Sequence, residues 1–231
     1  MKRKMKNYLA YLAIVSVLFT SCSDANEEVI PNQSIQRSEL IFTAMSEDVT
    51  PHGDHFHGIS NGVEKESITV KFDSNGHPEE NGHLHLEADV VYKMQLKVYD
   101  FDNKEIQDEF IASREVANSY KAFLIGNKLH VNGEQNNQQG AIFYPRDLVY
   151  GNGESTNTSN KYELTGILSY FTIGEQNAKE TQRLTFVLRK LADASTKEKI
   201  ELKDLIRNDE LIPFPGTDIL KLKFEVHVGS H

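Results

Sequence analysis

Apolar and polar residues alternate with a period of two along much of the chain. The alternation is clearest at residues 90–99, 183–189 and 220–228. Because successive side chains of a strand point to opposite faces, each segment predicts a strand with one buried and one solvent-facing side. Weaker signals of the same kind predict further strands at 40–44, 67–72, 106–112, 120–125, 140–144 and 163–173.

Turn-forming residues separate these segments, in stretches such as "SNGHPEENG" and "GNGESTNTSN". Only residues 196–209, "TKEKIELKDLIRND", have a helical spacing of apolar residues, and they predict one short connecting helix at most. About nine short strands joined by polar turns are typical of an antiparallel, immunoglobulin-like β-sandwich. The expected fold class is therefore all-β, and the lack of alternating strands and helices argues against a Rossmann-type sheet.

The amino end has the features of an export signal. Four basic residues within the first six precede an apolar run at 8–19, which is too short for a membrane-spanning helix. The run ends at "TSC", which resembles the lipobox of bacterial lipoproteins, where the cysteine is lipidated and begins the mature chain. We therefore predict a signal peptide at 1–21, a lipidated Cys22 with a flexible acidic tether at 22–37, and a single β-sandwich domain at 38–231.

Cys22 is the only cysteine among the 231 residues. A single thiol makes no internal disulfide, so a thioether to lipid explains its presence in an exported chain. The alternative is an ordinary signal peptide with an incidental cysteine. Acyl chains contribute about 0.8 kcal/mol per buried methylene, so lipidation predicts firm anchoring to the outer membrane, facing the periplasm or the cell surface. Residues 23–28, "SDANEE", resemble the acidic tag that directs Bacteroidetes lipoproteins to the surface.

The charge balance narrows the choice of partners. The chain has 34 acidic and 25 basic residues, and four of the basic ones precede the predicted cleavage point. The mature chain therefore has 21 basic against 34 acidic residues, a net charge of −13. This charge argues against nucleic acid and anionic lipid as partners and suits the binding of cations.

Three strand motifs occur in an order that resembles a family of small Bacteroidetes lipoproteins. They are "YKMQLKV" at 92–98, "LTFVLRK" at 184–190 and "GTDILKLKFEV" at 216–226. The resemblance implies an immunoglobulin-like β-sandwich and a role in handling a metal ion or haem. Where relatives have a "DEHQ"-like cluster, this chain has "ANSY" at 117–120, so a function tied to that cluster does not carry over.

The histidines carry the candidate chemistry, since six of the nine lie between residues 52 and 85. In "PHGDHFH", His55 and His57 would share one face of an extended chain, and Gly53 allows a turn that brings in His52. Three neutral imidazoles can then converge on one ion. Zn²⁺ takes imidazole nitrogens in a tetrahedral set of four ligands, so this triad needs a fourth.

The same heptapeptide resembles the His-x-x-His-x-His motif of streptococcal histidine-triad proteins, in which the histidines bind zinc. His83 and His85, in "GHLHLEAD", are two residues apart and would share one face of a strand. We expect them to support the triad, and His83 or His85 would complete its set of ligands if the first strand region ran beside residues 82–86. Asp54 is expected either as a ligand or as an acceptor that orients an imidazole, and His227 could join a site beside Glu225.

The chain lacks the motifs H-E-x-x-H, G-x-S-x-G, the P-loop and C-x-x-C-H, and nothing in it requires catalysis. The leading hypothesis is a lipoprotein that binds a transition metal, zinc above all, through His52, His55 and His57. Its role would be capture or delivery of the ion, with an outer-membrane transporter as a partner. The alternatives are non-covalent haem binding by paired histidines, and an adhesion module in which the histidines are incidental and exposed aromatics such as Tyr99 make the contacts.

Overall fold

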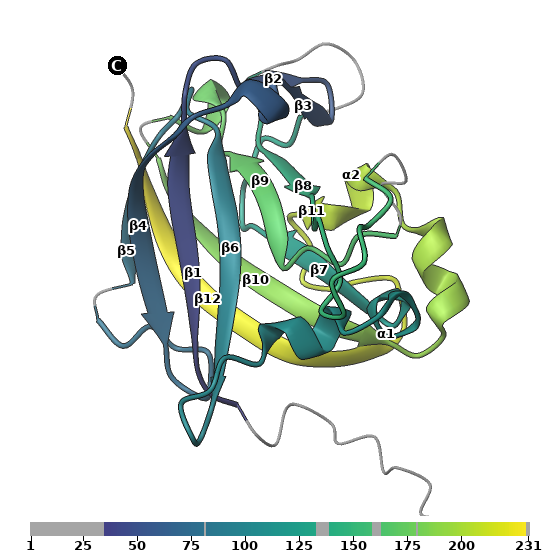
Figure 1. Ribbon diagram of the computed structural model, residues 1–231. Coiled ribbons are helices and arrows are strands. Elements are labelled where there is room, and N and C mark those ends of the chain that lie inside the picture. Colours follow the sequence, from purple (N-terminus) through teal and green to yellow (C-terminus); the bar gives the residue numbers. More distant parts are fainter. Residues whose placement is uncertain (1–34, 81, 133–138, 159–162, 179, 230–231) are drawn as a thin grey trace, which may run out of the picture. The chain divides into compact units, whose positions relative to one another are not determined.

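Two five-stranded sheets face each other in the computed structural model, which describes residues 35–80, 82–132, 139–158, 163–178 and 180–229 (Figure 1). The first sheet contains, in spatial order, β4 (Glu64–Phe72), β1 (Ile35–Met45), β6 (Tyr92–Asp100), β9 (Leu168–Thr172) and β8 (Ile142–Pro145). The second sheet contains β11 (Ile206–Arg207), β7 (Tyr120–Ile125), β10 (Thr181–Leu191), β12 (Gly216–Gly229) and β5 (His83–Glu87). The prediction of an all-β sandwich is confirmed.

Aromatic residues on the inner faces of the sheets form the centre of the core. The ring centroids of Phe42 in β1 and Phe224 in β12 lie 5.8 Å apart, and those of Phe143 in β8 and Phe186 in β10 lie 6.3 Å apart. All four side chains are buried. Offset and edge-to-face contacts of this kind stabilise a pair beyond the apolar area that it buries. The strong period-two segments are confirmed as β6, β10 and β12.

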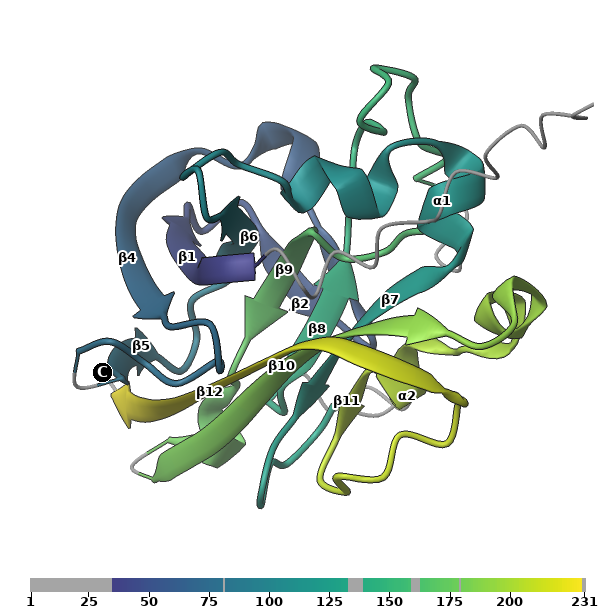
Figure 2. The same ribbon diagram turned by 90° about the horizontal axis from the view of Figure 1, so that it is seen from below.

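Most neighbouring strands are antiparallel, but both edges of the second sheet are parallel pairs. At one edge β11 pairs with β7, and at the other β5 pairs with β12. Figure 2 shows β5 beside the end of β12. The β5–β12 register places His83 opposite Glu225 and His85 opposite His227. A parallel pair needs a long connection, so it brings together residues that are distant in sequence.

Two sequence predictions need correction. Residues 106–112 do not form a strand; they contain the 3-10 helix η3 (Gln107–Ile111), which the α-helix α1 (Arg114–Asn118) follows. The buried residues here are Ile106, Phe110 and Ile111, a helical spacing and not an alternation. The segment 163–173 is a strand only at β9.

The segment 196–209 is not one helix. It contains most of the 3-10 helix η5 (Ala194–Lys199), the α-helix α2 (Leu202–Leu205) and the short strand β11. A capping box fixes the start of α2, since Glu201 caps the helix and the Asp204 carboxylate accepts from its backbone N–H. Two further 3-10 helices, η2 (Ile59–Asn61) and η4 (Glu175–Asn177), connect strands.

The domain begins slightly earlier than expected. Strand β1 starts at Ile35, so residues 35–37 of the predicted tether belong to the sandwich. The predicted signal peptide, Cys22 and the rest of the tether lie outside the described residues. All described residues belong to one compact unit. No helix in the described ranges is both long and apolar enough to cross a membrane.

Candidate metal centres

A two-stranded hairpin carries the triad. It pairs β2 (Thr50–His52) with β3 (His55–His57), so that His52 lies opposite His55 and Thr50 opposite His57. Gly53 opens the two-residue loop with φ +57°, a left-handed conformation that glycine adopts without steric cost. The sequence prediction that Gly53 turns the chain and brings His52 toward the other two is confirmed.

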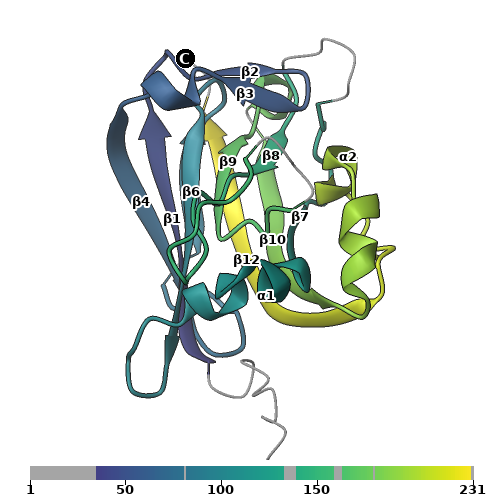
Figure 3. The ribbon, with the colours of Figure 1, turned by 45° about the vertical axis from the view of Figure 1, so that its right-hand side comes forward.

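The hairpin is attached to the first sheet by the side chain between the histidines. Phe56 points away from His55 and His57, is 6% exposed, and packs with ring centroids 6.3 Å from Tyr144 and 6.4 Å from Tyr170. The loop is also held, because the Asn132 side chain donates a hydrogen bond to the Gly53 carbonyl. Figure 3 shows the hairpin lying across the end of β8 and β9. Its histidines consequently face solvent.

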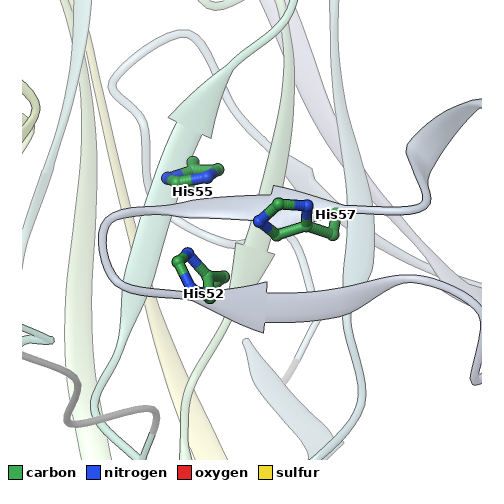
Figure 4. Close-up of side chains that lie close together, drawn as sticks. All are labelled: His52, His55 and His57. Atoms are coloured by element: carbon green, nitrogen blue, oxygen red, sulfur yellow. The ribbon is translucent and has the colours of Figure 1, made fainter.

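The three imidazoles gather at one place, as Figure 4 shows. Their ring centroids are 4.7 to 5.3 Å apart, and one nitrogen of each ring lies within 4.8 Å of the others. Around tetrahedral Zn²⁺, ligand nitrogens are roughly 3.3 Å apart, given metal–nitrogen bonds of 2.0–2.1 Å. His52 and His57 are exposed and His55 is half-buried, so small side-chain rotations close this difference. The group has three members and leaves one coordination position open.

Asp54 accepts a hydrogen bond from the ring of His55, with Oδ1 2.9 Å from Nδ1. A neutral imidazole carries one N–H. Donation from Nδ1 therefore leaves the Nε2 lone pair of His55 available to a metal ion. A carboxylate in this position fixes the tautomer and the orientation of the ring. The geometry gives Asp54 the orienting role, the second of its two expected roles.

A second group lies at the β5–β12 edge and joins His83, Glu225 and His227. Nδ1 of His83 is 2.9 Å from Nε2 of His227 and 3.3 Å from Oε2 of Glu225. The parallel register of the two strands creates this group. His83 and Glu225 are about half and one third exposed at their side chains, 47% and 32% respectively.

His85 shares a face with His83, as the sequence predicts, but it is not a member of this three-ligand group. Its ring stacks on that of His227, with centroids 5.1 Å apart and planes at 22°. The expectation that His83 or His85 completes the triad is wrong. The triad lies on the hairpin over the first sheet, whereas His83 joins residues of β12 in the second sheet.

Sequence reasoning pointed to His227 and Glu225 without assigning them to a site. The signal that favours them is their spacing of two on the solvent-facing side of β12. The partner strand could not be identified, because β5 has no tight turn linking it to β12. The remaining described histidines are outside both groups: Nδ1 of His77 is 3.9 Å from an Asp73 oxygen, and the backbone of His130 bonds Asn177.

Among the residues that the structure describes, the sandwich thus presents two separate groups of imidazoles, one on a hairpin and one across a strand pair. Comparison with family models, with curated proteins and with solved structures finds no match to this chain.

Proposed function

We propose that the protein captures a divalent transition metal ion, zinc foremost, with His52, His55 and His57 as ligands. The observation that carries the proposal is the convergence of three imidazoles on a hairpin whose loop supplies an orienting carboxylate, Asp54. Imidazole nitrogen is a good ligand for zinc, copper and nickel. No cysteine occurs in the described ranges, so thiolate ligation there plays no part.

The open coordination position favours capture and release over a structural role. Structural zinc sites have four protein ligands and are closed, whereas the triad supplies three and faces solvent. An ion bound there remains accessible to a competing ligand. Protonation of histidine at mildly acidic pH would also weaken the site, because metal ligation needs neutral imidazole.

The predicted lipid anchor gives the proposal its setting. A lipidated Cys22 would hold the domain at the outer membrane by a tether, within reach of membrane partners. The mature chain is strongly acidic, which would raise the local concentration of cations near the triad. We therefore propose delivery of the ion to an outer-membrane transporter as the role of the protein.

Calorimetric titration of residues 22–231 with Cys22→Ser tests the site. We expect wild type to bind one more equivalent of Zn²⁺ than a His52→Ala/His55→Ala/His57→Ala variant. The matched control is His77→Ala/His130→Ala, which removes imidazoles outside both groups and should leave binding unchanged. Equal stoichiometry and affinity in wild type and the triple variant would refute the assignment.

The geometry does not favour the two alternative functions. Within each group, ring centroids of neighbouring imidazoles are about 5 Å apart, and one potential ligand atom of each member lies within 4.8 Å of the others, a spacing that suits ligation of one small ion. Tyr99, expected as an exposed contact residue of an adhesion module, is only 9% exposed, and the Arg37 guanidinium lies 3.5 Å from its ring centroid. Exposed apolar side chains occur at Phe101, Leu148 and Val149, and these would be the contact residues of an adhesion module.

A further inference from the structure

Three potential ligand atoms meet at the β5–β12 edge. They are Nδ1 of His83, Nε2 of His227 and Oε2 of Glu225. The two distances from Nδ1 of His83, 2.9 and 3.3 Å, are close to the roughly 3.3 Å separation of ligand atoms around tetrahedral zinc. Both distances are thus close to the separation that ligation of one shared ion requires.

Neighbouring side chains orient two of the three atoms. Thr181 Oγ1 lies 3.0 Å from Nδ1 of His227, the nitrogen on the far side of the ring. Arg183 donates from Nε to Oε1 of Glu225 at 2.9 Å, which directs the other oxygen toward the histidines. Such outer partners are typical of metal ligands.

Counting protons shows why an ion would fit here. When Nδ1–H of His227 donates to Thr181, its Nε2 carries a lone pair. Nδ1 of His83 then provides at most one N–H for two acceptors, His227 Nε2 and Glu225 Oε2. A metal ion in place of that proton would satisfy all three inner atoms at once, with His83 carrying its proton on Nε2.

We propose that His83, His227 and Glu225 form a second site for a divalent transition metal ion, independent of the hairpin triad. Two imidazoles and one carboxylate are a ligand set that zinc and other first-row metals accept. These three ligands leave coordination positions open. His83 and Glu225 also line a groove of about 600 Å³ whose wall includes Arg183 and Asn127. An ion at this site can therefore exchange with solution.

This site would differ from the triad in its mechanical effect. Its ligands come from β5 and β12, and His83 and His227 are 144 residues apart in the sequence. A bound ion would link the edge strand β5 to its neighbour, whereas an ion at the triad would link only the two strands of one hairpin. Binding at the second site should therefore slow amide hydrogen exchange in β5.

The experiment uses residues 22–231 with Cys22→Ser and the three triad histidines replaced by alanine. Calorimetric titration with Zn²⁺ should show one remaining equivalent, and His227→Ala in this background should weaken it about 100-fold or more, beyond the effect of losing an outer partner. Glu225→Gln, which keeps the side-chain shape, should weaken it in the same direction. His85→Ala is the control, because His85 lies on the same face but outside the ligand set. It should leave the affinity for Zn²⁺ within about twofold of that of the triad variant.

Hydrogen exchange provides a second measurement. Zn²⁺ should protect residues 83–87 in the triad variant and not after His227→Ala is added. The proposal is overturned if the triad variant binds no zinc, if His227→Ala keeps the equivalent, or if His85→Ala weakens binding as much as His227→Ala. The outcome also separates the two proposals. If replacing the triad removes an equivalent of bound Zn²⁺ and His227→Ala removes none, only the hairpin site is supported. If His227→Ala removes an equivalent and replacing the triad removes none, only the second site is supported.

Discussion

Polar neighbours decide which nitrogen faces the group for two of the candidate histidines, His55 and His227. Asp54 engages Nδ1 of His55, and Thr181 engages Nδ1 of His227. In both cases the Nε2 atom is left for a ligand or a metal ion. The orientation of the rings thus depends on residues that never touch the ion.

The Asp54–His55 pair leads to a prediction. Asp54→Asn removes the charge that accepts from Nδ1, and we expect zinc affinity at the triad to fall 10- to 100-fold, the usual effect of losing such a partner. Calorimetric titration in a His227→Ala background isolates the triad. Glu47→Gln, an equal change of charge at an exposed position close to the hairpin, is the control. An unchanged affinity for Asp54→Asn would mean that Asp54 does not orient His55.

At the scale of elements, the hairpin depends on one buried ring. Phe56 is its only fully buried side chain in β2 and β3 and packs on Tyr144 and Tyr170. We expect Phe56→Ala to speed amide exchange at residues 50–57 while leaving exchange in β1 unchanged, because the hairpin is a small unit at the end of the sheet. Phe56→Leu, which keeps apolar volume, should show a smaller effect. Uniformly faster exchange throughout the domain would contradict this local role.

Two glycines of the hairpin region should respond differently to substitution. Both have positive φ, +57° at Gly53 and +75° at Gly58. A Cβ at Gly53 would meet open space, whereas a Cβ at Gly58 would lie 1.9 Å from the Asp48 carbonyl oxygen. Gly53→Ala should therefore lower the free energy of unfolding by about 1–2 kcal/mol, the cost of the backbone conformation alone.

Gly58→Ala should cost clearly more, because the steric clash requires backbone movement in addition to the unfavourable φ. Chemical denaturation of both variants checks the order. Equal losses of stability would show that the backbone around Asp48 moves to accommodate the added methyl group without a further cost in free energy.

Local patterns in the sequence predicted the elements well where one face is buried and the other wet. The hairpin followed from Gly53, and β6, β10 and β12 from their alternating residues. Other predictions failed where alternation was only apparent: at 106–112 the buried positions Ile106, Phe110 and Ile111 have helical spacing. Ser113, whose side chain accepts from the Val116 N–H, is an N-cap signal that indicates α1.

The second metal group could be predicted only in part, because its geometry is not local. His83 and His85 share a face by simple strand periodicity, but their neighbour depends on the pairing of β5. A parallel edge strand has no hairpin turn to mark its partner. The meeting of His83 with Glu225 and His227 therefore depends on the packing of the whole sheet.

At the scale of the whole molecule, two buried lysines link distant segments. Lys121 of β7 donates to the Leu164 carbonyl at 2.7 Å, and Lys197 of η5 donates to the Ala117 carbonyl and to Thr165 Oγ1. Both side chains are almost fully buried. Asp147, also buried, accepts from three backbone N–H groups, those of Thr165, Gly166 and Leu168.

Burial lowers the pKa of Lys121 to about 7, and the charge of Asp147 only partly opposes this. The pKa of Lys197 is lowered as well, first by desolvation and then by the charge of Lys121. A lysine in the unfolded chain has a pKa near 10.4. Between about pH 7 and pH 10 the unfolded state therefore holds a proton on Lys121 that the folded state has released.

Stability should consequently rise with pH over this window. The contribution of Lys121 has a slope of up to about 1.4 kcal/mol per pH unit, since one proton is involved. Lys121→Met should remove this slope, so that the difference in stability between variant and wild type changes steadily from pH 7 to pH 10. Chemical denaturation at several pH values measures it, and parallel curves for the two proteins would contradict the prediction.

The long separation of His83 and His227 in the sequence also affects the order in which the two imidazole groups form. The hairpin triad spans only six consecutive residues, but the hairpin packs through Phe56 on Tyr144 and Tyr170, so it is held in place only after β8 and β9 have been made. The β5–β12 group must wait for one of the last strands of the chain to be made and inserted, because closing a long loop comes late and slowly. A newly made chain would thus complete the hairpin group before the β5–β12 group, because β12 follows β8 and β9 in the sequence.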